Sequence, residues 1–133
     1  EEIANNHKLD RFIHLPVQSG SDSVLYRMNR GYTREDYLNI IKKLRQAAPD
    51  VVLGTDIIVG FPGETEEEFA DTVDLAKKVN WHLAFVNIYS PRPGTSANQL
   101  YRDDVPYAIK KRRWQILDEL INKKNLKQRP KVV

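Results

Sequence analysis

Candidate ligand-binding residues lie at the ends of three short apolar segments of this chain. They are Gln18 and Ser19 after residues 11–17, Asp56, Ile58 and Gly60 within or directly after residues 51–59, and Tyr89, Ser90 and Arg92 at the end of residues 83–89 or after it. Amide and hydroxyl groups suit ribose hydroxyls, and a guanidinium suits a carboxylate or a phosphate. Because the carboxyl ends of parallel strands meet at one edge of a sheet, we expect these residues to share one rim.

The central segment runs from an apolar strand through a Gly/Pro loop to the start of a helix. Residues Val51–Val59 are dominated by Val and Ile, as in a strand that is covered on both faces. Glycine and proline between positions 60 and 63 end the strand, and Thr65 with Glu68 forms the pattern of a helix capping box. Two interpretations remain open: a ligand-binding loop, and an ordinary turn that needs glycine for a positive φ.

Asp56 is the most informative polar residue because it falls inside the apolar strand. Strand alternation places it on the same face as Ile58 and Gly60, which we predict to be the interior of a barrel. An unpaired carboxylate there would be unfavourable, so Asp56 is either paired structurally or a ligand contact. His14 also lies within a predicted strand, where a hydrogen-bonded core histidine is favoured over a general base. Arg30 and Arg92 are candidate anchors for an anion or ordinary surface charges.

Composition limits the chemistry that these 133 residues can perform. The chain has no cysteine, which excludes disulfides and thiolate-held metals or iron–sulfur clusters within it. The histidines and acids show no metal-site spacing. No apolar run is long enough for a bilayer and no signal peptide opens the chain, so we expect no membrane contact and a cytoplasmic location. The first residue is Glu1, not methionine, and an upstream segment is therefore expected.

Helices are predicted between and after the apolar segments. Ser21 or Asp22 caps a short helix, Thr33 with Asp36 begins a longer one, Thr65 begins an acidic one that ends near Asn80, and Pro106 begins the last. Their predicted apolar faces are Val24, Leu25 and Met28; Tyr37, Ile40, Ile41, Leu44 and Ala48; Phe69, Val73, Ala76 and Val79; and Ile109, Ile116, Leu117, Leu120 and Ile121.

The strand starts recur near residues 12, 52 and 83, close to the roughly 30 residues of one unit of a β/α barrel. We therefore predict an α/β fold: a partial (β/α) barrel of about three parallel βα units over residues 1–121. Residues 122–133 are predicted to be a basic linker. Residues 107–133 contain nine Lys/Arg and two acids, a composition that suits either a solvated helix or contact with a phosphate backbone.

Four segments together resemble the radical S-adenosylmethionine methylthiotransferases, most closely the branch that modifies tRNA. They are His14-Leu-Pro-Val-Gln-Ser-Gly-Ser-Asp22, Arg27-Met-Asn-Arg-Gly-Tyr-Thr-Arg34, residues 55–65, and Tyr89-Ser-Pro-Arg-Pro-Gly-Thr95. The resemblance covers residues 11–126. It implies that the chain is the C-terminal half of a radical SAM barrel. The barrel's three-cysteine motif, an N-terminal domain and a C-terminal RNA-binding β domain lie outside it.

The resemblance also implies an activity for the parent enzyme. Two 4Fe-4S clusters, S-adenosylmethionine and a tRNA anticodon stem-loop would take part, and a methylthio group would be added to C2 of N6-isopentenyladenosine. The present chain lacks the cluster-binding cysteines and is not expected to catalyse this alone. Three alternatives stay open: a ribosomal-protein methylthiotransferase, a non-catalytic RNA-binding module, and a phosphate-ester enzyme with an anion site near Gly63, against which Glu64 argues.

Site roles follow from the resemblance in the same way. Gln18 and Ser19 would lie near the ribose, and Ile58, Val59 and Gly60 would line the adenine. Arg30 would hold the methionyl carboxylate, and the last strand would contribute Tyr89, Ser90 and Arg92. The family pattern Gly-x-Ile-x-Gly-x-x-Glu has Asp56 in place of its first glycine here, and Glu64 stands one position late.

Overall fold

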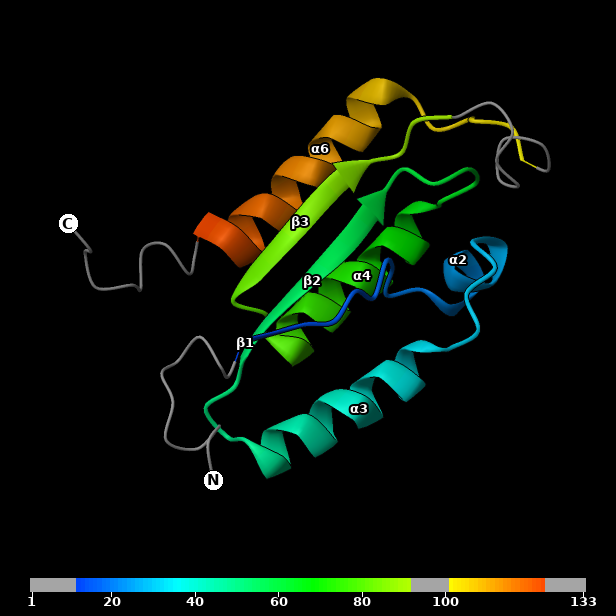
Figure 1. Ribbon diagram of the computed structural model, residues 1–133. Helices are drawn as coiled ribbons and strands as arrows, with labels where there is room; N and C mark the ends of the chain where they lie inside the picture. The colour runs from blue at the N-terminus through cyan, green and yellow to red at the C-terminus, as the bar shows by residue number, and fades with distance from the viewer. Residues whose placement is uncertain (1–11, 92–100, 124–133) are drawn as a thin grey trace.

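The computed structural model describes residues 12–91 and 101–123 (Figure 1). Three parallel strands, β1 (Phe12–His14), β2 (Val52–Val59) and β3 (Leu83–Ile88), form one sheet in the order β1-β2-β3. His14 pairs with Gly54 and Asp56 with Phe85. Helices connect the strands, which confirms the predicted α/β fold with parallel βα units.

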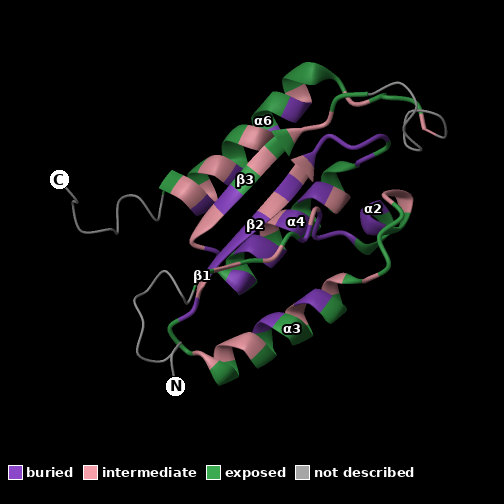
Figure 2. Ribbon diagram, viewed as in Figure 1, coloured by how far each residue is buried: buried purple, intermediate pink, exposed green. Residues whose placement is uncertain are grey.

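The helices α3, α4 and α6 pack together with one face of the sheet. The described helices are α2 (Asp22–Arg27), α3 (Arg34–Ala47), α4 (Glu66–Val79) and α6 (Tyr107–Leu117), the last continuing as the π-helical segment η2 (Asp118–Lys123). Buried and half-buried residues alternate along β2 (Figure 2), and the buried set Leu53, Ile57 and Val59 belongs to the core. The opposite face stays open within the described chain: Phe85 on β3 is 54% exposed.

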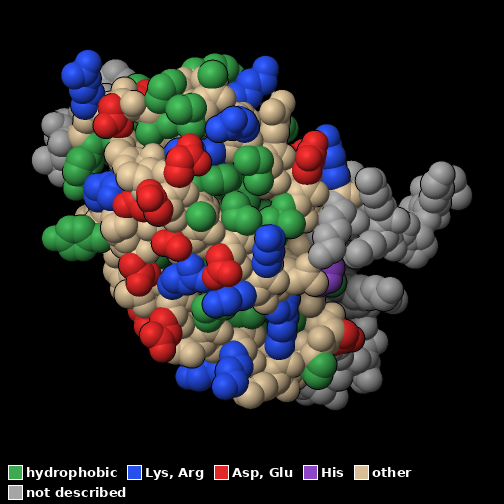
Figure 3. All heavy atoms as spheres, turned by 180° about the vertical axis from the view of Figure 1, so that it is seen from behind, with side chains coloured by type: hydrophobic (Ala, Val, Ile, Leu, Met, Phe, Trp, Pro, Cys, Tyr) green, Lys and Arg blue, Asp and Glu red, His purple; other side chains and the backbone are tan. Residues whose placement is uncertain are grey.

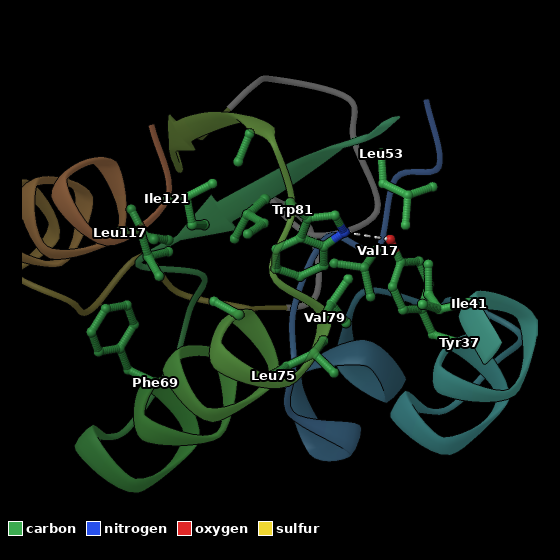
Figure 4. Close-up of a cluster of buried hydrophobic side chains, with 14 of the residues drawn as sticks. Val17, Tyr37, Ile41, Leu53, Phe69, Leu75, Val79, Trp81, Leu117 and Ile121 are labelled. Carbon is green, nitrogen blue, oxygen red and sulfur yellow. Dashed lines mark hydrogen bonds between the residues drawn. The ribbon is translucent and has the colours of Figure 1, made fainter. Parts of the chain in front are cut away.

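Trp81 lies at the centre of the core, in the turn between α4 and β3 (Figure 4). Its indole Nε1 donates to the Tyr37 hydroxyl at 2.9 Å, and that hydroxyl donates to the Leu15 carbonyl at 2.8 Å. The two bonds satisfy polar atoms that would otherwise be buried without partners. They also tie α3 to the segment that follows β1 and leads to Gln18.

Both predicted capping boxes are present, at Thr33 with Asp36 and at Thr65 with Glu68. Ser21 is the N-cap of α2. Each cap fixes where a helix begins after a loop at the carboxyl end of the sheet. The loops that carry the candidate site residues are therefore anchored on their helical side.

Several predicted apolar faces are wrong in detail. Ile40 is 45% exposed and Ile116 is 41% exposed, because each lies at the edge of its helix and not on the side that meets the sheet. In α4, Thr72 and Leu75 are buried beside the predicted residues. The predicted linker boundary at residue 122 also shifts: η2 reaches Lys123, and the Asn122 side chain bonds both the N–H and the C=O of Ala84 at 2.8 Å. That amide therefore pairs with the outer edge of β3.

An ion pair joins α2 to the first turn of α4. The two terminal nitrogens of Arg27 donate to the Glu68 carboxylate at 3.0 and 2.9 Å, and Ser23 donates to it at 2.6 Å. The bonds from Arg27 are the main reason that the pKa of Glu68 falls from 4.5 to about 2. Stability from this group is present above pH 4.5 and is lost as pH falls towards 2.

We expect Glu68→Gln to remove roughly 2 kcal/mol of stability at pH 7 and little at pH 2, because glutamine keeps the cap but not the charge. Urea unfolding across this range measures the difference. Glu67→Gln, an exposed neighbour in the same turn, is the matched control. An equal pH dependence in the two variants would contradict the assignment.

Acidic, basic and apolar side chains lie intermingled on the face seen from behind (Figure 3). Among the described residues, ion pairs join Arg34 and Lys78 to Asp74. Of the nine Lys and Arg of the basic tail, residues 107–133, four lie in residues 124–133, outside the described residues. Its predicted contact with a phosphate backbone stays a prediction.

Candidate functional site

The carboxyl ends of the three strands are joined side by side. Gln18 N–H donates to the Asp56 carbonyl and Ile58 N–H to the Gln18 carbonyl, both at 2.9 Å. On the other side of β2, Tyr89 N–H donates to the Val59 carbonyl at 2.9 Å. We call Gln18, Ile58, Gly60, Tyr89 and Ser90 the rim; they lie at or next to the carboxyl ends of neighbouring parallel strands, as the sequence predicted.

Gln18 is held in a left-handed conformation with φ 75°, which is uncommon outside glycine. The two backbone hydrogen bonds of Gln18 hold this conformation. A third bond supports it, since the N–H of the preceding Val17 donates to the buried Thr55 hydroxyl at 3.0 Å. Tertiary contacts thus hold Gln18 in a backbone conformation that is intrinsically unfavourable for glutamine. Such constrained positions occur often at ligand sites.

Ser19 has a different setting from Gln18. It is fully buried, and its hydroxyl accepts a hydrogen bond from Ser21 N–H and lies 3.4 Å from the Thr72 hydroxyl of α4. Gly20 N–H donates to the same Thr72 hydroxyl at 2.9 Å. The Ser19 side chain therefore packs the loop against α4.

The open face of the sheet carries a histidine–carboxylate pair. His14 Nε2 lies 3.1 Å from Asp56 Oδ2, and the two side chains are 35% and 32% exposed. The His14 ring also lies 5.9 Å from the Phe85 ring. Asp56 is thus paired and still accessible from the open face, so pairing and ligand contact are compatible. His14 has a partner as predicted, but it lies on the open face and not in the core.

Alternation along β2 separates two other predicted residues. Ile58 follows Asp56 on the open face and is half-buried, whereas Val59 is fully buried on the helical side. Val59 can therefore reach a ligand on the open face through its backbone alone. Its carbonyl is already used by Tyr89 N–H.

Two carboxylates occupy backbone donors of the loop after β2, one from the loop itself and one from the segment before α6. Gly60, with φ 77°, donates its N–H to Glu64 Oε1 at 2.8 Å, and Gly63 N–H donates to Asp104 Oδ1 at 2.8 Å. Glu64 is 5% exposed, and burial raises its pKa against the opposing effects of Gly60 N–H and Arg113. Because acids occupy these donors, the predicted alternative of a phosphate site at Gly63 is wrong for this loop.

Two cations of α6, predicted to belong to a solvated basic segment, are buried beneath the rim. Lys110 donates to the Tyr89 carbonyl at 3.1 Å, and Arg113 donates to Glu64 Oε1 at 2.8 Å. Lys110, Arg113 and Leu117 are the buried residues of α6 and follow i, i+3, i+7 spacing. That spacing is the one signal in the sequence that could have placed both cations on the inner side.

The remaining predicted residues lie at or outside this edge. The Tyr89 ring packs edge-on against Phe61 at 5.2 Å, and burial raises the pKa of its hydroxyl. Ser90 is exposed next to it, whereas Arg30 is exposed in the connection between α2 and α3 and no described contact links it to the rim. Arg92 lies outside the described residues.

Within residues 12–91 and 101–123, no cluster of three or more His, Cys, Asp or Glu could hold a metal ion. In that same part of the chain, none of the helices has the length and apolar character that crossing a membrane requires. Along one edge of the sheet the described residues gather an amide, a hydroxyl, a paired carboxylate and half-buried apolar surface.

Comparison with known proteins identifies a family for this chain. The sequence model of the Radical SAM superfamily matches residues 1–76. A tRNA-2-methylthio-N(6)-dimethylallyladenosine synthase of Thermotoga petrophila is 50% identical over 127 residues, which cover 96% of this chain and 29% of that protein. A synthase of the same name from Neisseria meningitidis serogroup A is 55% identical over 114 residues, 86% of this chain and 26% of that protein. The chain thus spans less than a third of these relatives.

A solved structure shares the fold. Coproporphyrinogen III oxidase from Escherichia coli, described as a radical SAM enzyme, superposes with a TM-score of 0.67 and 22% identity. The superposition covers 82% of this chain and 25% of that one. At this level of identity the likeness supports the architecture of the βα units alone.

Proposed function

The chain belongs to the radical SAM superfamily, and we propose that it is the half-barrel that positions S-adenosylmethionine in a tRNA-2-methylthio-N6-dimethylallyladenosine synthase. The observation that carries this is the joining of three strand tips into one rim. Identity of about half to such synthases over nearly the whole chain supports the substrate assignment. A tRNA anticodon stem-loop and a cytoplasmic location follow from the proposal.

The rim has the chemistry that a nucleoside needs. The Gln18 amide and the Ser90 hydroxyl would bind ribose hydroxyls, while half-buried Ile58 and the backbone at Val59 and Gly60 would lie along the adenine. S-adenosylmethionine bound there would supply the 5′-deoxyadenosyl group for hydrogen abstraction from the tRNA base. The residues of this chain bind and orient it.

The other predicted residues would act around this nucleoside. Asp56, held by His14, would offer a fixed acceptor on the open face, and Tyr89 would close the β3 side of the adenine. Arg30 and Arg92 would bind the methionyl carboxylate, since a guanidinium offers a fork of N–H donors that suits two oxygens. Ser19 would keep Gln18 in place through Thr72.

The clusters of the proposed enzyme do not fit the residues of this chain. A 4Fe-4S cluster is held by cysteine thiolates, and the 133 residues contain no cysteine. The ligands of both clusters would therefore come from outside it. The part of these residues in the reaction is limited to the cofactor's nucleoside and methionyl groups.

The test is Asp56→Asn in the full-length protein, with affinities for S-adenosylmethionine and S-adenosylhomocysteine measured by calorimetry. Loss of the negative charge, with an NH2 donor in place of one acceptor oxygen, should weaken both by about tenfold, about 1.4 kcal/mol. Asp71→Asn, an exposed acid on α4, is the control and should bind as the wild type does. Unchanged affinity with a lowered melting temperature would make Asp56 structural and remove it from the site.

A further inference from the structure

The helix α6 turns two positive charges towards the rim and two away from it. Lys110 and Arg113 are each 4% exposed, whereas Lys111 and Arg112 between them are exposed. Burying a Lys or Arg is unfavourable unless its donors are paired, and apolar residues of similar volume often serve stability as well or better. The contacts of the two buried cations therefore need an explanation beyond packing.

Lys110 connects three separate parts of the chain. Its ammonium donates to the Tyr89 carbonyl at 3.1 Å and to both Asp103 carboxylate oxygens, at 2.7 and 3.0 Å. Its aliphatic stem covers Gly60 so closely that a Cβ there would lie 2.3 Å from the Lys110 Cγ. One side chain thus touches the tips of both β2 and β3.

Arg113 holds the other end of the β2 loop. Nη1 donates to the Glu64 carbonyl at 3.1 Å and to Glu64 Oε1 at 2.8 Å, and Nη2 donates to Glu66 at 3.0 Å. The same Oε1 accepts from Gly60 N–H. A continuous path of hydrogen bonds therefore runs from α6 through Glu64 to the backbone of Gly60.

Arg113 is imperfectly satisfied in this position. Its Nε is buried and has no hydrogen-bond partner among the described residues. A buried donor without a partner lowers stability. The inner side of α6 thus carries two buried cations, Lys110 and Arg113, and the unpaired Arg113 Nε. Apolar side chains at these two positions would avoid both the buried charges and the unpaired donor.

From these contacts we infer that α6 is a clamp on the rim, with Lys110 and Arg113 as positioning residues for the nucleoside part of S-adenosylmethionine. Lys110 sets the spacing between Gly60 and Tyr89, and Arg113 sets the direction of the Gly60 backbone through Glu64. Neither touches the ligand. The inference rests on the proposed function, since the rim is the surface that the clamp orders.

The test compares Lys110→Met with Lys111→Met in the full-length protein with its clusters. Methionine keeps an unbranched stem over Gly60 and removes the ammonium. We expect Lys110→Met to weaken S-adenosylmethionine binding and to raise its KM by about tenfold, because displaced contacts weaken binding steeply. The kcat at saturating cofactor and the affinity for tRNA should change less than twofold. Lys111→Met should match the wild type in S-adenosylmethionine affinity, in KM and in kcat.

Rescue and a milder variant keep the result interpretable. Lys110→Arg retains a donor and should recover part of the affinity. Asp103→Asn removes the carboxylate that pairs with the Lys110 ammonium, and Asp103 is not a core residue. This variant should weaken S-adenosylmethionine binding about threefold, and it can be measured even if Lys110→Met does not fold. Equal affinities in Lys110→Met and Lys111→Met would overturn the clamp. Failure of the wild type to bind S-adenosylmethionine would instead overturn the proposed function.

Discussion

Arg113→Met should lower the free energy of unfolding by about 3–5 kcal/mol, because it leaves the buried Glu64 carboxylate without its cation. Arg113 and Glu64 are 4% and 5% exposed and 2.8 Å apart. Methionine restores most of the lost volume, so the loss reports the missing charge. Urea unfolding at pH 7.5 measures it.

The pH dependence of this loss has a defined sign. Burial already raises the pKa of Glu64, and removing Arg113 removes a group that opposes the rise. A carboxyl with a raised folded-state pKa favours the folded state below its unfolded pKa and loses that advantage as pH rises through the folded value. The deficit of Arg113→Met should therefore be smaller at pH 4.5 than at pH 7.5.

The neighbouring residue gives the control for Arg113→Met. Arg112 is exposed on the same helix, and Arg112→Met should change stability by no more than about 0.5 kcal/mol. The double variant Glu64→Gln with Arg113→Met should be more stable than Arg113→Met alone, since no buried charge is left. A loss below about 1 kcal/mol for Arg113→Met would show that the pair is not coupled as its geometry indicates.

Local sequence patterns were sufficient to predict the strand, the glycine turn and the helix cap that carry the candidate site. Val and Ile between 51 and 59, glycine at 60 and the cap at Thr65 depend on neighbours within a few residues, and the structure has each as predicted. The joining of the strand tips followed from parallel topology. These features need no knowledge of distant contacts.

The side-chain pairs around the site could not be predicted, because their members are far apart in the sequence. Glu64 and Arg113 are 49 residues apart, and His14 and Asp56 are 42 apart. A helix rich in Lys and Arg is predicted to face solvent unless a buried acid lies opposite it. The residues of α6 and their near neighbours do not indicate that Glu64 lies there. The burial of Lys110 escaped prediction in the same way: besides nearby Asp103, its ammonium bonds the Tyr89 carbonyl, 21 residues away.

Gly20→Ala should destabilise the protein by about 3 kcal/mol, although it adds a single methyl group. A Cβ at Gly20 would lie 2.6 Å from Thr72 Cα and 2.8 Å from the Asp71 carbonyl oxygen, both backbone atoms of α4. Side chains can rotate away from such a contact, whereas the helix backbone cannot. The loop after β1 must therefore move away from α4. Thermal and urea unfolding measure the loss.

Gly31 is the matched control, since a Cβ there meets nothing within 4 Å. Gly31→Ala should leave stability unchanged or raise it by up to about 1 kcal/mol through the unfolded chain. The variants Gly20→Ala and Gly31→Ala should also differ in their affinity for S-adenosylmethionine. Moving the Gly20 loop displaces Gln18, whose N–H and C=O bond β2 on either side of Ile57, so Gly20→Ala should weaken S-adenosylmethionine binding at temperatures where the variant is still folded. A folded Gly20→Ala protein with wild-type affinity would mean that the β1 tip does not contribute to the nucleoside site.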